Sequence, residues 1–136
     1  MSDFKSKANV VLDQAKTLFG EKAEALAKQP EKLKQVLSKV TEKIRELSHN
    51  PKVQKLIEPI SIFIRMIKAH FNGSHKISGG TLGLIVLGLV YFISPVDIIP
   101  DFLGFFGYAD DLSVILAIFA RLKDEVEEFL DWERTS

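Results

Sequence analysis

The sequence predicts an all-α protein, a helical bundle of about five or six helices around an apolar helical hairpin. Apolar residues recur at steps of three and four along most of the 136 residues, which is the period of helices with one buried face. Proline and glycine interrupt this pattern where helices are expected to start or end, at Pro30, Asn50-Pro51, Asn72-Gly73 and Ser94-Pro95. Residues 77–120 contain no Lys, Arg or Glu. This stretch therefore predicts a hairpin that either protein or lipid must enclose.

The charges are distributed unevenly along the chain. The first 76 residues carry 15 basic and 8 acidic groups, whereas the last 60 carry 3 and 10, so a net charge of +7 is followed by one of −7. We therefore expect a basic amphipathic helical region over residues 1–72 and an apolar hairpin domain with an acidic C-terminal helix over residues 73–136. The chain has no cysteine, which excludes a disulfide framework, a cysteine zinc site and a thiol nucleophile.

The first predicted helix covers residues 1–20, and its amphipathic pattern differs from the continuous apolar run of a secretory signal. The protein is therefore expected to stay on the side of the membrane where it is made. Gly20 is expected to end this helix, because glycine readily adopts the left-handed conformation found at helix ends. A short helix is then expected over residues 21–29. The predicted buried face of the first helix consists of Phe4, Ala8, Val11, Ala15 and Leu18.

Two longer basic helices follow. Pro30 is expected in the first turn of a helix that ends at Asn50-Pro51, because the missing N–H of proline costs nothing in a first turn. The next helix covers about residues 51–71 with Pro59 inside it as a predicted kink, and Asn72-Gly73-Ser74 forms a turn. The buried face of the first of these helices is predicted to consist of Leu33, Val36, Leu37, Val40, Ile44 and Leu47. That of the second is predicted to consist of Val53, Leu56, Ile57, Ile60, Phe63, Ile64, Ile67 and Phe71.

The lysines of this basic region allow more than one interpretation. They fit the solvated faces of an ordinary helical bundle. They also fit a surface that rests on anionic lipid headgroups, where each basic residue gains about 1 kcal/mol. A homodimer through the Leu33–Leu47 seam is a further interpretation, because alternating steps of four and three are typical of paired helices. Nucleic acid is not expected as a partner, because the lysines alternate with glutamates and no binding motif accompanies them.

The hairpin begins with a helix over residues 81–93, which is apolar on every side but, at about 20 Å, short for a membrane span. Ser94 and Pro95 are typical of a new helix start, as the N-cap and the first helical residue. Pro100 then stops or redirects this turn. After an aromatic loop over residues 102–108, Asp110-Asp111 opens one last helix, whose apolar positions continue to Leu130.

The turn of the hairpin carries a motif. An aromatic pair precedes Ser-Pro-Val-Asp-Ile-Ile-Pro-Asp-Phe at residues 94–102, and Gly-Tyr-Ala-Asp-Asp follows at residues 107–111. This motif resembles that of the YkvA-like domain family, which comprises mostly bacterial domains of unknown function that are often described as membrane-associated. The resemblance covers roughly residues 70–120 and implies a fold and a location rather than a reaction. The residues expected to shape the turn are Ser94, Pro95, Pro100, Gly107 and Tyr108.

Four aspartates in this motif are the candidate site residues: Asp97, Asp101, Asp110 and Asp111. A carboxylate in apolar surroundings needs a partner. Backbone N–H groups at helix starts and turns are one kind of partner. A Mg²⁺ or Ca²⁺ ion is the second, because both ions prefer oxygen ligands, and a Lys or Arg of the basic region is the third.

The leading functional prediction is a small non-enzymatic scaffold or interaction protein, associated with membrane lipid or a membrane protein on the cytoplasmic side. The alternative is a soluble helical binding module with a divalent cation or a partner at the aspartates, and a carboxylate-dependent metalloenzyme is a weaker third. No nucleophile or phosphate-binding loop accompanies the carboxylates, so no catalytic residue is predicted. His70 and His75 are five residues apart and share no helical face, so we expect solvated side chains rather than metal ligands.

Overall fold

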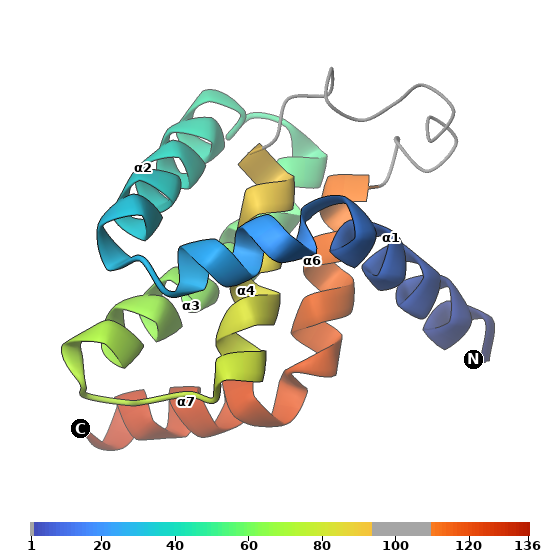
Figure 1. Cartoon of the computed structure of the whole chain (residues 1–136). Coiled ribbons are helices and arrows are strands. Elements are labelled where there is room, and N and C mark those ends of the chain that lie inside the picture. Colours follow the sequence, from blue (N-terminus) through green and yellow to red (C-terminus); the bar gives the residue numbers. More distant parts are fainter. Residues whose placement is uncertain (1, 94–109) are drawn as a thin grey trace.

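A computed structural model describes residues 2–93 and 110–136, and these residues form helices joined by short connections (Figure 1). The predicted all-α bundle is thereby confirmed for this part of the chain. Its helices are α1 (Ser2–Ala27), α2 (Pro30–Glu46), α3 (Pro51–Asn72), α4 (Gly79–Ile93), α6 (Asp110–Arg121) and α7 (Lys123–Thr135).

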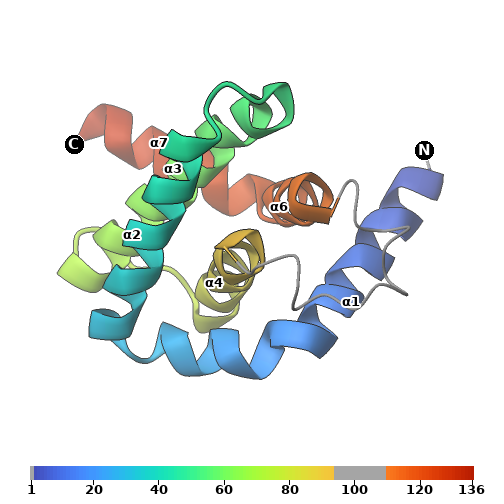
Figure 2. The ribbon, with the colours of Figure 1, turned by 90° about the horizontal axis from the view of Figure 1, so that it is seen from above.

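The apolar helix α4 lies at the centre of the bundle. Seen from above, α1, α2, α3 and α6 surround it (Figure 2). Ten of its fifteen residues are buried. A helix that is apolar on every side needs an apolar environment on every side, and in this fold the neighbouring helices provide it.

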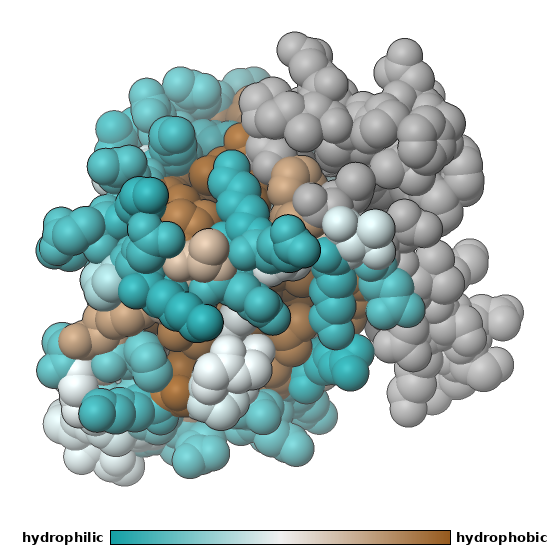
Figure 3. Space-filling view, in the orientation of Figure 1, coloured by the Kyte–Doolittle hydropathy of each residue, from teal (hydrophilic) through white to brown (hydrophobic). Residues whose placement is uncertain are grey.

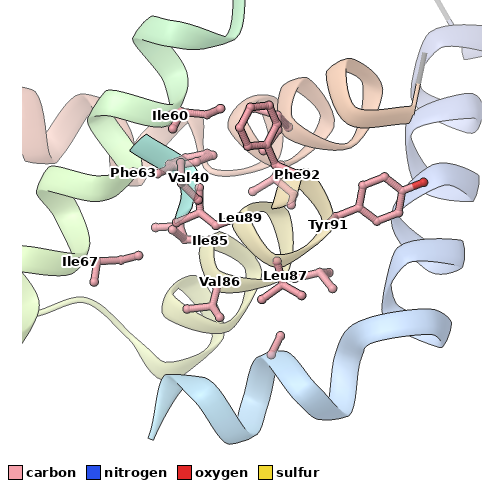
Figure 4. Close-up of a cluster of buried hydrophobic side chains, with 14 of the residues drawn as sticks. Val40, Ile60, Phe63, Ile67, Ile85, Val86, Leu87, Leu89, Tyr91 and Phe92 are labelled. Carbon is pink, nitrogen blue, oxygen red and sulfur yellow. The ribbon is translucent and has the colours of Figure 1, made fainter. Parts of the chain in front are cut away.

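The side chains of α4 point toward several of these neighbours (Figure 4). Tyr91 extends toward α1, where its ring meets that of Phe19 edge-on with 5.6 Å between the ring centroids. Leu89 lies on the side of α3, which contributes Phe63, and both side chains are fully buried. Burial of one such side chain stabilises the fold by about 1.5–3 kcal/mol. The helices around α4 therefore derive much of their stability from contact with it.

The first helix is longer than predicted. α1 runs from Ser2 through Gly20 to Ala27, so the predicted end at Gly20 and the separate short helix were wrong. Buried side chains at steps of three and four continue past Gly20, and packing of this stripe against α4 and α6 holds the last two turns in the helix. Among the α1 residues whose burial the structure describes, the stripe consists of Leu12, Ala15, Phe19, Ala23 and Leu26. Ala15 belonged to the predicted face, whose other members, Phe4, Ala8, Val11 and Leu18, lie outside the described side chains.

The two basic helices follow their predictions more closely. α2 begins at Pro30, α3 begins at Pro51, and Pro59 lies inside α3. In the seam of α2 the side chains of Leu33, Val36, Leu37 and Val40 are buried within the chain; a homodimer through this seam stays a prediction. Five of the eight predicted core positions of α3 are buried, whereas Ile57 and Phe71 are 37% and 39% exposed.

The last predicted helix is bent into two helices. α7 continues from α6 in a different direction, and the bend lies at Leu122 (Figure 1). Backbone hydrogen bonds continue through it: the Leu122 N–H donates to the Ile118 carbonyl at 2.9 Å, and the Val126 N–H donates to the Leu122 carbonyl at 2.8 Å. No glycine or proline marks the bend, so the periodicity alone predicted a single helix.

Contacts across the molecule explain the new direction of α7. Phe129 of α7 is buried, and Glu133 accepts two hydrogen bonds from the Arg65 guanidinium of α3, at 2.9 and 3.1 Å. Side chains from residues 12 to 129 belong to one hydrophobic core, to which the predicted basic and acidic regions both contribute. The division of the chain near residue 72 stays a prediction. On the face shown in Figure 3, polar side chains form the outer layer and hydrophobic ones lie in the hollows between them.

Candidate functional site

Two of the four candidate aspartates lie within the described residues. Asp110 and Asp111 form the start of α6, where the positive end of the helix dipole favours a carboxylate. Asp97 and Asp101 lie outside the described residues, as do the predicted turn residues Ser94, Pro95, Pro100, Gly107 and Tyr108. In the part of the chain that the structure describes, no three His, Cys, Asp or Glu residues come together as a metal site. The candidate Mg²⁺ or Ca²⁺ site at the four aspartates therefore stays a prediction.

The motif runs from the end of α4 to the start of α6, and these two helices approach each other closely at Gly88. A Cβ atom at this position would lie 2.9 Å from Cδ1 of Ile118 and 3.3 Å from Cδ1 of Ile115. At Gly79 and Gly83, by contrast, an added Cβ would meet nothing within 4 Å. Because Gly88 has no side chain, α4 and α6 can pack closely at this point. The motif connects the ends of these two helices.

A lysine of the basic region lies at the C-terminal end of α4. The Lys43 ammonium donates a hydrogen bond to the backbone carbonyl of Phe92 and lies 4.7 Å from the centroid of the Phe92 ring. Both the helix dipole and the ring face favour a cation there. The basic region therefore places a positive charge next to the residue where the motif begins. Sequence reasoning missed this contact because the two residues are 49 positions apart and no local pattern links them.

A cleft of about 780 Å³ lies between α1, the start of α4 and the bend between α6 and α7. Ser78 caps α4 on its wall: the serine hydroxyl accepts a hydrogen bond from the Thr81 N–H at 3.1 Å. Both signs of charge occur around the cleft, so its lining does not select a ligand by charge. The charged lining residues are Lys16, Glu21, Glu24, Arg121 and Glu125.

A second hollow region, which we name the α2–α3 groove, runs between α2 and the second half of α3. It consists of two adjoining hollows of about 440 and 620 Å³ that share Lys34, Leu37 and Lys68. Its apolar lining is Pro30, Leu33, Leu37, Ile64, Ile67 and Phe71, and its charged lining is Lys34, Glu42, Arg45 and Lys68. An apolar floor beside mainly positive groups suits a ligand that has an apolar part and an anionic part.

Hydrogen bonds hold the connection between α3 and α4. Gly73 has a φ of 84°, a left-handed conformation that glycine adopts without strain. His70 Nδ1 accepts a hydrogen bond from the Ile77 N–H at 3.0 Å, which requires an unprotonated Nδ1. Burial and the charge of Lys76 lower the pKa of His70 below its ordinary value of 6.5. The neutral form of His70 therefore suits its role in this connection.

The second histidine of this segment also has specific contacts. The His75 ring lies 5.4 Å from the Phe129 ring and 5.1 Å from the Trp132 ring, measured between centroids. Both histidines are partly exposed, so they are less solvated than predicted and also have specific contacts within the chain. Sequence spacing missed their role, because the partners of His75 belong to α7, more than fifty residues away.

Comparison with known proteins shows the family to which the chain belongs. A family model described as a protein of unknown function, DUF1232, matches residues 81–117. The chain is also 32% identical over 80 residues to the "Uncharacterized membrane protein YkvA" of Bacillus subtilis (strain 168), in an alignment that covers 58% of this chain and 76% of that protein. The chain belongs to the YkvA-like family. The resemblance predicted from the motif is thus confirmed. No solved structure matches the chain.

The segment matched by the YkvA-like family model runs from α4 through the motif into α6. It contains Gly88 and all four candidate aspartates. The helices that form the α2–α3 groove lie outside it. Within residues 2–93 and 110–136, no helix combines the length and the apolar character needed to cross a membrane. The apolar helix α4 has fifteen residues and a length of about 22 Å.

Proposed function

We propose that this protein is a non-enzymatic scaffold or interaction protein that associates peripherally with the cytoplasmic face of a membrane. The observation that carries the proposal is the α2–α3 groove, where basic side chains surround an apolar floor on the outside of the bundle. The name of the Bacillus relative, a membrane protein, supports the location.

A peripheral mode of attachment follows from where the apolar and basic side chains lie. The apolar residues of α4 already pack against four other helices, so attachment to lipid is left to the surface. Together α2 and α3 carry nine basic and four acidic residues. The cytoplasmic leaflet is anionic, and each basic residue at its surface contributes about 1 kcal/mol to binding. This excess supports the cytoplasmic side.

Fractionation of the untagged protein from cells that produce it naturally tests the proposal. We expect the protein in the membrane pellet at low salt and in the supernatant after a high-salt wash, because salt screens contacts between lysines and headgroups. A protein that stays in the supernatant at low salt would reject membrane association. Release only by detergent would reject the peripheral mode in favour of a hairpin embedded in lipid.

A second candidate function is a binding module whose aspartates hold a divalent cation or a partner. The enclosure of α4 by protein favours it, because the apolar helix of the hairpin then belongs to the core of a helical bundle rather than to lipid. Under this proposal Ca²⁺ or Mg²⁺ raises the melting temperature, because an ion that binds the folded state stabilises it. Replacement of Asp97 and Asp111 by asparagine should remove that rise. A melting temperature that neither ion changes would count against this site.

A further inference from the structure

The α2–α3 groove combines an exposed aromatic side chain with basic residues from both helices. Phe71, at the end of α3, is 39% exposed and lines one of the two hollows. Lys34 of α2 and Lys68 of α3 line both hollows, and Leu37 forms part of the floor between them. The start of α2 and the end of α3 lie side by side in both Figure 1 and Figure 2. A phenylalanine beside lysines is typical of surfaces that enter the interface of a membrane.

The charges of the groove favour an anionic occupant. Its lining has three basic residues, Lys34, Arg45 and Lys68, and one acidic residue, Glu42. Lys34 also lies 3.6 Å from Glu31, but these side chains are 73% and 88% exposed. Such an exposed pair contributes little to stability, so a phosphate can compete with the Glu31 carboxylate for the Lys34 ammonium.

We propose that the α2–α3 groove is the surface through which this protein docks on anionic phospholipid. Headgroup phosphates bind Lys34 and Lys68, and the Phe71 ring inserts among the acyl chains. This inference rests on the proposed membrane association and assigns it to one face. A lipid surface is favoured over an acidic protein segment because the groove combines its lysines with an apolar floor and the exposed Phe71 ring, as contact with both headgroups and acyl chains requires.

The size of the effect follows from the charges that are removed. Each basic residue near an anionic membrane contributes about 1 kcal/mol, so Lys34→Ala combined with Lys68→Ala should weaken binding about 30-fold. The charge contribution falls as salt increases, because the Debye length shortens. Phe71→Ala removes apolar contact rather than charge, so it should weaken binding by a factor that changes little with salt.

Co-sedimentation of the full chain with vesicles tests this assignment. One set of vesicles contains phosphatidylcholine with phosphatidylglycerol, and the other contains phosphatidylcholine alone. The matched control variant is Lys32→Ala with Lys39→Ala, which removes the same charge from exposed positions of α2 that do not line the groove. These two residues are seven apart and so lie on one side of the helix. Circular dichroism and urea unfolding establish that each variant is folded.

We expect the wild type and the control variant to bind the anionic vesicles with similar affinity and the groove variant to bind about 30-fold more weakly. Equal losses in the groove and control variants would overturn the groove assignment while membrane association stands. A wild type that binds neither set of vesicles would overturn the proposed function itself. If the protein instead self-associates without lipid in a salt-sensitive way, and the groove variant abolishes this self-association, the occupant of the α2–α3 groove is a second copy of the chain.

Discussion

Gly88→Ala is predicted to destabilise the protein although alanine is the better helix former. The added methyl group would lie 2.9 Å from Cδ1 of Ile118 and 3.3 Å from Cδ1 of Ile115, distances shorter than ordinary van der Waals contact. Both isoleucines are fully buried, so their methyl groups can move only by displacing other core side chains. Overpacking of this kind costs about 1–3 kcal/mol.

Helix propensity acts in the opposite direction and must be separated from the packing cost. Alanine stabilises a helix interior by about 1 kcal/mol relative to glycine, so the net loss for Gly88→Ala is at most about 2 kcal/mol. Gly83→Ala is the matched control, because its added methyl group would meet nothing within 4 Å. The difference in stability between the two variants should therefore be about 1–3 kcal/mol, with Gly83→Ala the more stable.

Urea and thermal unfolding measure this difference, and about 1 kcal/mol corresponds to roughly 4 °C in Tm for a chain of this length. Ile118→Val supplies a second test, because it deletes the Cδ1 atom that the added methyl group would contact most closely. In the Gly88→Ala background this deletion should cost about 1 kcal/mol less than in the wild type. Equal stability of the two alanine variants, or additive effects in the double variant, would refute the close contact between α4 and α6.

Two further predictions concern the connection between α3 and α4. Ser78→Ala removes the hydroxyl that accepts the Thr81 N–H, so it should lower the free energy of unfolding by about 1 kcal/mol, with Ser78→Asp restoring most of it. Urea unfolding measures both variants, and an unchanged midpoint would contradict the cap. Because the pKa of His70 is lowered in the folded state, the unfolded state binds the proton more readily, and stability should fall as the pH drops below 6.5. His70→Gln should flatten this dependence in urea unfolding, and an equally steep dependence would exclude His70 as its source.

The basic helices could be predicted because their local signals and their tertiary packing agree. Pro30 and Pro51 begin α2 and α3, and the apolar stripe of each helix is the one that packs inward. At Gly20 the local signal and the packing disagree. Glycine favours an end, but the buried stripe continues beyond it, and the contact of α1 with α4 and α6 decides in favour of the helix. At Leu122 no local signal exists, and the bend follows from the partners of α7.

The features of the candidate site also fall into those that a local sequence signal predicts and those that depend on tertiary packing. The start of α6 at Asp110 could be predicted, because acidic residues favour the first turn of a helix. The contact of Lys43 with Phe92 could not, because two helices far apart in sequence must first pack together. The α2–α3 groove also belongs to this second kind. Its lysines were recognised as a charge excess, but which of them meet across two helices depends on the tertiary fold.

The apolar character of α4 alone could not decide between protein and lipid as its environment, because both impose the same pattern on a helix. What separates the two cases is whether other helices of the chain have apolar faces left over to cover it. Here α1, α2, α3 and α6 each direct a buried stripe inward, and ten residues of α4 are buried among them. A helix satisfied in this way gains nothing further from transfer into lipid. The proposed contacts with a membrane are therefore assigned to the outward side of the bundle, where the basic side chains of α2 and α3 line a groove with an exposed phenylalanine.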